Sequence, residues 1–177
     1  MVRVPGSSAP PARSGAPLML VQHEIPVEDE IAQFDLRPGP NPLVIVVPGA
    51  MRGKGRPRFA RMGKGVRAFT DAATANAETW VKACAIEQVG QPMLATALAV
   101  NVSVIVQIPR SWPKKRQDQA RRGELLPTGK PDLDNVVKLI ADALNGIVWH
   151  DDAQVCALST TKAYADEPQT TIRVSEA

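Results

Sequence analysis

The stretch "ALAVNVSVIVQI" at residues 97–108 constrains the fold more than any other part of the chain. It is rich in β-branched residues and alternates between apolar and polar positions, which is typical of a strand with one buried face. Similar runs are "PLVIVVPG" at 42–49, a segment that starts near Gln154, and "QTTIRVS" at 169–175. The chain therefore has to build a sheet from strands that are spread along most of its length.

Two helical segments separate these strands. We expect a first helix from about residue 71 to residue 88, capped by Thr70 or Asp71. A second helix ends at Leu144, where an Asn-Gly pair gives the usual signal for a helix C-terminus. The sequence therefore predicts an α+β fold, with a small mixed sheet of about four to five strands and two main helices.

The N-terminal part has a different composition. Residues 1–40 are rich in Pro, Ala, Gly and Ser, and such a segment cannot bury enough apolar surface to offset its ordering entropy. We expect a disordered tail over 1–40 and one folded domain over 41–177. No stretch has the length and hydrophobicity of a transmembrane helix, and the start lacks the apolar core of a signal peptide, so we expect a cytoplasmic protein.

The cysteines and histidines are few and scattered. Cys84 and Cys156 lie far apart in apolar surroundings, and the two histidines are His23 and His150. This spacing does not favour a zinc site or a disulfide framework. We expect both cysteines to be small core residues in a reducing compartment.

The net charge of +3 hides two basic segments. Between residues 52 and 67 there are seven Lys or Arg residues and no acid, and the "GKG" at 63–65 predicts a hairpin that joins strands at 58–61 and 66–69. A second basic loop lies within 109–128. Segregated positive charge is typical of proteins that bind nucleic acid, although two solvated loops remain the alternative. The candidate DNA-binding residues are Arg52, Lys54, Arg56, Arg58, Arg61, Lys64, Arg67, Lys114, Lys115 and Arg116.

The stretch "GKPDLDNVVKLI" at 129–140 sets two aspartates at the start of an apolar helix. Pro131 biases the residue before it away from helical angles, so we expect an extended lead-in. In an extended segment, positions two apart share a face, so Asp132 and Asp134 would project together and repel unless a cation lay between them. The alternative is capping, in which Asp134 or Asn135 caps the helix and the other acid interacts favourably with the helix dipole.

Two further features extend this acidic pair. Lys138 follows Asp134 by one helical turn and Asp142 lies another turn along, although this pattern also fits a weak ion pair on a solvated face. A second acidic pair at 151–152 follows Trp149, which we expect to anchor a turn in the core. If that turn returns beside the start of the helix, three carboxylates converge into a hard-oxygen site for Mg²⁺ or Mn²⁺. With a lysine to stabilise charge on phosphate, the set fits a DNA nuclease.

The segment "KPDLDNVVKLIADALNGIVWHDDAQV" at 130–155 resembles the signature of the RusA family of Holliday junction resolvases, the crossover junction endodeoxyribonucleases. In that family a "PDLDN…K…DAL" helix is followed by a "W-x-DD-x-Q" turn. Upstream, "RGKGRPRF" and "VRAFTDAATANAETWV" resemble the family's basic loop and first helix, so the resemblance covers about residues 42–175. It implies that 41–177 is a RusA-like nuclease domain that forms a homodimer and cuts branched DNA in symmetry-related strands with Mg²⁺, for which Mn²⁺ substitutes.

The resemblance also assigns roles by position. It implies four catalytic residues, of which three acids bind the metal and one lysine acts on the reaction: Asp132, Asp134, Asp152 and Lys138. Asp152 is preferred to Asp151 because the family ligand is the second Asp of its pair. Asn135 and Asp151 are expected to support the metal ligands.

The expected partners follow from the substrate. A four-way junction has two-fold symmetry, so a homodimer would match it, and we expect the interface in the strands at 97–108 and 154–175. We expect neither a nucleotide cofactor nor a membrane. The alternatives are a non-cleaving branched-DNA-binding accessory protein of the same fold and a DxD nucleotide-sugar transferase, which would require a larger nucleotide-binding domain.

Overall fold

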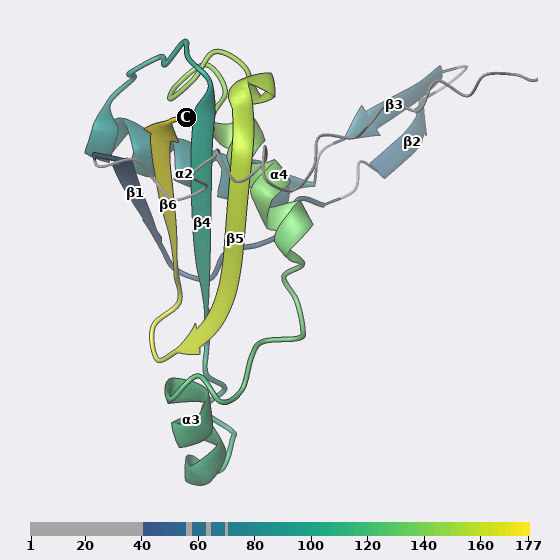
Figure 1. The fold of residues 1–177 in the computed structure, drawn as a ribbon. Coiled ribbons are helices and arrows are strands. Elements are labelled where there is room, and N and C mark those ends of the chain that lie inside the picture. Colours follow the sequence, from purple (N-terminus) through teal and green to yellow (C-terminus); the bar gives the residue numbers. More distant parts are fainter. Residues whose placement is uncertain (1–40, 56–57, 63–64, 70) are drawn as a thin grey trace, which may run out of the picture. The chain divides into compact units, whose positions relative to one another are not determined.

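The computed structural model of the chain describes residues 41–55, 58–62, 65–69 and 71–177 (Figure 1). For the strands at 58–62 and 65–69 it describes the backbone alone. The expected disordered tail at 1–40 lies outside the described residues, as do Arg56 and Lys64.

Four strands form one mixed sheet, as the sequence predicted. The strand order is β1-β6-β4-β5, in which β4 and β5 are parallel while β1 and β4 both pair antiparallel with β6. The bounds are β1 Leu43–Pro48, β4 Leu98–Gln107, β5 Val155–Ala165 and β6 Gln169–Glu176. The parallel pair β4 and β5 requires a crossover connection, and the chain provides it with its helical segment before β5. An α+β fold is therefore confirmed.

The predicted hairpin is also present in the backbone. Strands β2 (Arg58–Met62) and β3 (Gly65–Phe69) pair antiparallel in a two-stranded sheet of their own. Met62 is paired with Gly65, which leaves two residues for the turn, as expected for a tight hairpin.

Among the described residues there are three α-helices, where the sequence predicted two main helices. Helix α2 spans Ala72–Val89 with Asp71 at its N-cap, and helix α4 spans Leu133–Leu144. The extra helix, α3 (Lys114–Arg121), lies within the basic segment that was expected to be a loop. Its residues are good helix formers but lack an apolar periodicity, and only Ala120 is buried, so the usual signal of an amphipathic helix is missing.

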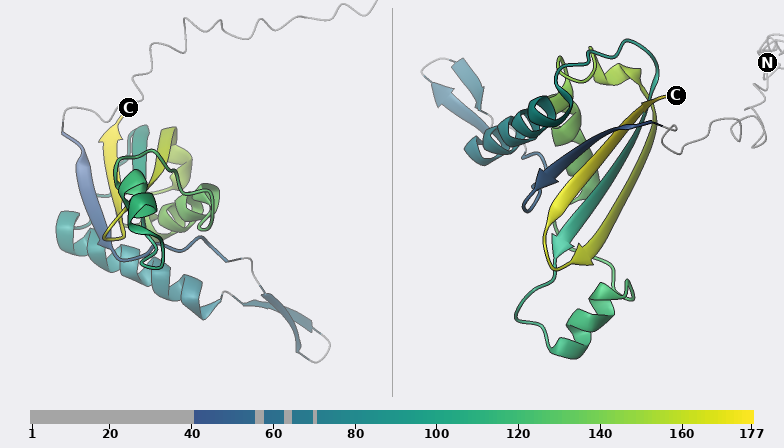
Figure 2. Two further views of the ribbon diagram at one scale, coloured as in Figure 1. Left: turned by 90° about the horizontal axis from the view of Figure 1, so that it is seen from below. Right: turned by 90° about the vertical axis from the view of Figure 1, so that its left-hand side faces the viewer.

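The core lies between the sheet and helices α2 and α4, which both cover one face of the sheet (Figure 2). Alternate residues of β4 point into this core: Leu98, Val100, Val102 and Val104. The intervening positions are more polar, and the Asn101 side chain donates a 2.7 Å hydrogen bond to Ser159 Oγ on β5. The sheet therefore has one apolar face, covered by helices, and one polar face.

Trp149 anchors the turn after α4, as expected. Its side chain is 1% exposed, and its indole N–H donates a 2.6 Å hydrogen bond to Oδ1 of Asn145. The prediction that both cysteines lie in the core is correct for Cys84 and wrong for Cys156. Cys84 is buried, and burial raises the pKa of its thiol. Cys156 is exposed near the start of β5, because the apolar neighbours that suggested burial belong to an edge strand.

Candidate active site

The start of α4 differs from both predictions made for Asp132 and Asp134, namely a shared extended segment and a cap formed by Asp134 or Asn135. The N-cap is Asp132, which has extended backbone angles (φ −76°, ψ 133°) and whose side chain accepts no capping hydrogen bond from the helix. The helix begins at Leu133, so Asp134 already lies in its first turn. The expectation that Asp134 or Asn135 caps the helix is therefore wrong. The expectation that both acids share an extended segment is wrong for the same reason.

Lys162 on β5 holds the segment that leads into α4. Its ammonium donates hydrogen bonds of 2.8 Å to the carbonyl oxygen of Gly129 and 3.0 Å to that of Pro131. Lys162 pairs with Val104 in the parallel ladder, and so lies on the face of the sheet that α4 covers. The strand β5 thereby positions the residue immediately before Asp132. The sequence did not indicate a role for Lys162. Its partners are backbone carbonyl groups, which every residue has, so no pattern of opposite charges identifies the contact.

The basic segment before β2 contacts the same helix from another side. The backbone N–H of Lys54 donates a 2.9 Å hydrogen bond to the carbonyl oxygen of Asn135. A side chain at Gly53 would place its Cβ 2.8 Å from Cβ of Asn135, so only glycine fits here without a shift. Asn135 was expected to support the metal ligands, and the structure shows it as the contact point of this segment.

The side chain of Lys54 is already paired. Its ammonium contacts the carboxylate of Asp142 on α4 and lies 3.5 Å from Oε1 of Glu78 on α2. These contacts join the basic segment to both helices of the core. Lys54 therefore acts as a structural tie here, although the sequence suggested a DNA contact.

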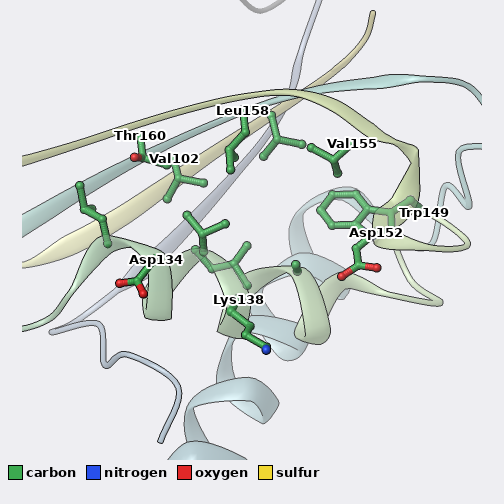
Figure 3. A pocket seen from close by; sticks show the side chains of 13 residues that line it. Val102, Asp134, Lys138, Trp149, Asp152, Val155, Leu158 and Thr160 are labelled. Atoms are coloured by element: carbon green, nitrogen blue, oxygen red, sulfur yellow. The ribbon is translucent and has the colours of Figure 1, made fainter. Parts of the chain in front are cut away.

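A groove of about 630 Å³ between α4 and β5 is lined by three of the four predicted catalytic residues (Figure 3). Asp134, Lys138 and Asp152 line it, and most of its remaining wall is apolar. Figure 3 shows Asp134 and Asp152 towards opposite ends of this groove, with Lys138 between them. Asp132 instead lines a second hollow of about 520 Å³, which it shares with the basic segment at 50–55.

The donor chemistry of these residues suits a hard divalent cation, but one chain does not assemble a complete set. Asp132, Asp134 and Asp152 are exposed carboxylates, the ligand type that Mg²⁺ and Mn²⁺ prefer. Within the described ranges, no three His, Cys, Asp or Glu side chains are close enough to hold an ion together. The expected return of the 151–152 turn to the start of α4 is therefore not observed. Asp152 follows the C-terminal end of the helix, whereas the other two acids lie at its N-terminus.

Lys138 lies on α4, one helical turn after Asp134. Among the side chains that the structure describes, it forms no ion pair, and Asp142, its possible partner one turn along, contacts Lys54 instead. The reading of Lys138 as half of a solvated ion pair therefore has no support in the observed contacts.

The turn after Trp149 gives different tasks to its two aspartates. Asp151 caps the short helix η1 (Asp152–Gln154) by accepting a 2.8 Å hydrogen bond from the backbone N–H of Ala153. Gln154 fixes this turn, because its amide donates to the carbonyl oxygens of Leu94 and Thr96 at 3.0 and 2.9 Å. The Asp152 side chain stays exposed beside the groove. The roles of Asp152 as a metal ligand and Asp151 as its support stay predictions, and the glutamine of the "W-x-DD-x-Q" turn has a structural task.

The second basic segment contains paired and free cations. Arg121 donates hydrogen bonds to both carboxylate oxygens of Asp166, and this contact holds the pKa of the Asp166 carboxyl below its usual range. The guanidinium of Arg116 lies 3.8 Å from the ring centroid of Trp112, which packs edge-on against Tyr164 of β5. Lys114 and Lys115 are exposed on α3. Lys114, Lys115 and Arg116 thus remain candidates for phosphate contacts.

For the other predicted DNA-binding residues, the structure shows only where they lie. Arg52 is exposed and lines the hollow that contains Asp132. Arg58, Arg61 and Arg67 lie on β2 and β3. A contact of these residues with DNA remains a prediction.

No helix in the described part of the chain is long and apolar enough to cross a membrane.

Comparison with known proteins identifies the same family as the sequence signature. Residues 48–175 match the family described as endodeoxyribonuclease RusA. The uncharacterized protein YqaN of Bacillus subtilis (strain 168) is 32% identical over 125 residues, which cover 70% of this chain and 88% of that protein. The matched region contains strands β4 and β5, nearly all of β6, and the helices α2 and α4 that cover the sheet. Of β1 it contains only the last residue. The chain therefore belongs to the RusA family of endodeoxyribonucleases.

Proposed function

We propose that this chain is a Mg²⁺-dependent endodeoxyribonuclease that resolves four-way DNA junctions by paired, symmetric nicks, with Mn²⁺ able to replace Mg²⁺. The observation that carries the proposal is the groove that Asp134, Lys138 and Asp152 all line, with Asp132 at the N-cap of α4. These residues lie within the region that matches the RusA family.

The three acids would hold the divalent ion through their carboxylate oxygens. When bound, such an ion polarises the phosphate and lowers the pKa of a water molecule that attacks phosphorus. Asp132 and Asp134 have no cationic side chain as a partner in the described structure, so their charge is available for a metal. This arrangement also explains why two acids are tolerated at one helix start.

Lys138 would stabilise the phosphate as negative charge accumulates on its oxygens. The side chain is exposed beside Asp134 and Asp152, with no carboxylate bound to its ammonium in the described residues. A preorganised cation at this point acts on the transition state more than on the bound substrate.

Exposed cations of the two basic segments would bind the DNA backbone. Arg52 lies in the hollow that contains Asp132, so a phosphate held there would lie near the acidic residues. Lys114, Lys115 and Arg116 offer a second contact on α3, and a spread of this kind suits a branched substrate with several arms.

The decisive experiment incubates the purified protein with a synthetic four-way junction, with and without Mg²⁺. We expect paired nicks at symmetric positions that require the divalent ion, and no comparable cutting of linear duplex. Tight junction binding without any cleavage would favour the non-cleaving accessory protein instead.

A further inference from the structure

We propose that a hollow beside Trp80 on α2 binds a nucleobase released from the stack at the branch point of the DNA, while Arg52 contacts the attached phosphate. The proposal rests on the proposed function, because it assumes a branched DNA substrate. The hollow is separate from the groove between α4 and β5, and none of the predicted catalytic residues lines it.

The hollow has a volume of about 320 Å³ and is formed by α2, the end of β1 and the segment that follows β1. The residues that α2 contributes are spaced three and four apart, so they form a single stripe on the helix: Ala73, Asn76, Ala77 and Trp80. Residues 47–52 line the rest, and Gly49 turns the chain there with a φ of 94°, a conformation that favours glycine. A space of this size suits one flat ring system and not a large ligand.

Trp80 supplies an aromatic surface that is both exposed and fixed. The residue is 51% exposed, although most of the large apolar side chains in the described chain are buried. Its indole N–H donates a 3.1 Å hydrogen bond to the carbonyl oxygen of Pro48, the last residue of β1. This bond engages the only polar atom of the indole, so a ligand meets an apolar ring. Proteins that bind unpaired bases use aromatic rings of this kind for stacking.

The hydrogen bond to Pro48 also gives Trp80 a structural role, because β1 is an edge strand of the sheet. Gln88, about two turns further along α2, closes the neighbouring part of the same edge. Its side-chain amide accepts a 2.9 Å hydrogen bond from the N–H of Val46 and donates a 2.8 Å hydrogen bond to the carbonyl oxygen of Val46. Edge closure needs only such polar groups. It therefore does not explain why a half-exposed aromatic ring stands at this position.

The polar residues of the hollow complement a nucleotide. Among the lining residues that the structure describes, Arg52 alone is charged, and it forms no ion pair with another described residue. Asn76 is exposed and carries an amide that can both donate and accept hydrogen bonds. A nucleotide offers a flat ring to Trp80, polar base edges to Asn76 and a phosphate to Arg52.

Arg52 also connects this hollow to the one that contains Asp132. Ala50, Met51 and Arg52 line both of them. A DNA strand whose phosphate contacts Arg52 would therefore pass the acidic residues on one side and present a base to Trp80 on the other. In a linear duplex every base is paired and stacked, and releasing one costs free energy. The stack is interrupted at a branch point, where the cost is lower, so the hollow would favour branched DNA.

Junction affinity measured without divalent metal tests the proposal. Trp80→Ala should weaken binding of a four-way junction by about 5–150-fold, as for the loss of one base–aromatic stack, and leave binding of a linear duplex unchanged. Trp80→Phe keeps a ring but cannot donate to Pro48, so it should recover most of the affinity. Equal losses for the Ala and Phe variants would assign Trp80 to edge closure alone and overturn the proposal.

The matched control is Ile86→Ala. Ile86 is also an apolar residue of α2, 45% exposed, but it does not line the hollow. This variant should bind the junction as the wild-type protein does. If Trp80→Ala keeps full junction affinity and lowers the mass measured by light scattering, a second copy of the chain occupies the hollow, which also overturns the proposal.

Photo-cross-linking gives a readout on the unaltered protein. A four-way junction carries 5-iodouracil in place of one thymine next to the branch point, and the metal-free complex is irradiated and digested for peptide mapping. We expect a cross-link to the peptide that contains Trp80, and none when the same probe lies in the middle of an arm. Cross-links from the branch point that leave Trp80 unmodified would contradict the base site.

These experiments also separate the base site from the proposed function. A protein that cross-links through Trp80 but cuts no junction keeps the base site and removes the nuclease assignment. A protein that cuts junctions, with normal affinity in Trp80→Ala and no cross-link at Trp80, keeps the nuclease and overturns the base site.

Discussion

The backbone N–H of Lys54 donates a hydrogen bond to the carbonyl oxygen of Asn135, one residue after Asp134. This contact connects the first basic segment directly to the helix turn that carries the acidic pair. Lys162 on β5 holds the preceding residues through hydrogen bonds to the carbonyl oxygens of Gly129 and Pro131. The start of α4 is thus fixed by two segments far apart in the sequence, and the predictions below test both.

Gly53→Ala should destabilise the protein and disturb the acidic site. The added methyl group would meet Cβ of Asn135 at 2.8 Å, and overpacking of this kind costs about 1–3 kcal/mol in the free energy of unfolding. Urea denaturation measures the change. Gly129→Ala is the matched control, because a Cβ there has no neighbour within 4 Å. Equal stabilities for the two variants would contradict the close approach of the basic segment to α4.

Arg52→Ala and Lys54→Ala should differ in their effect on junction binding. Loss of a phosphate contact reduces the slope of log K against log salt by about one unit. We expect that reduction for Arg52, which is exposed, but not for Lys54, whose ammonium is bound by Asp142 and Glu78. Fluorescence anisotropy over a salt series, without divalent metal, measures both slopes. An equal reduction for the two variants would show that Lys54 leaves its carboxylates to bind DNA.

Lys162→Met should lower the cleavage rate and raise the Mg²⁺ concentration needed for half-maximal cleavage. Loss of a residue that orients metal ligands typically costs about 10–100-fold in metal affinity or activity. The two carbonyl groups lose their donor, and because water can reach them the cost in stability should be only about 0.5–1.5 kcal/mol.

The control for this change is Lys82→Met on α2, a half-buried lysine that lies outside both basic segments. It should leave the Mg²⁺ dependence unchanged. Lys162→Arg keeps donors for the carbonyl groups and should restore part of the activity. A normal Mg²⁺ dependence in Lys162→Met would show that β5 does not position the acidic residues.

Lys138→Ala should separate chemistry from stability. If the ammonium stabilises charge in the transition state, single-turnover cleavage should fall by about 10²–10³-fold, as for other single charge-stabilising groups. Junction affinity should change little, and the free energy of unfolding should change by no more than about 0.5 kcal/mol, because the side chain is exposed and forms no ion pair in the described residues. An unchanged cleavage rate would identify Lys138 as an ordinary surface residue.

The sequence predicted the sheet well because its strands carry a local signal. The predicted alternation around Asn101 is present in β4. The first and last residues of the four strands of the main sheet differ from the predicted ones by no more than one or two positions. The helix α3 was missed because its eight residues bury only Ala120 and so leave no periodic pattern. Local sequence patterns indicate which residues face the core, and α3 has only one such residue.

The site was predicted less completely for a physical reason. The acids and Lys138 stand in a continuous motif, and their types indicated metal chemistry directly. Their distances depend on the length of α4 and on how the chain returns after Trp149, which no local pattern encodes. The carbonyl contacts of Lys162 and the tie between Lys54 and Asp142 depend on tertiary packing in the same way.

The most direct test of the central claim uses a supercoiled plasmid that extrudes a cruciform, a four-way junction within closed DNA. Wild-type protein with Mg²⁺ should convert it to linear DNA, because two nicks are made before the protein dissociates. The Asp132→Asn/Asp134→Asn double variant should bind the cruciform and leave it supercoiled. Linear product from the double variant, or from the wild-type protein in the presence of EDTA, would contradict the assignment of these acids to a metal-dependent junction nuclease.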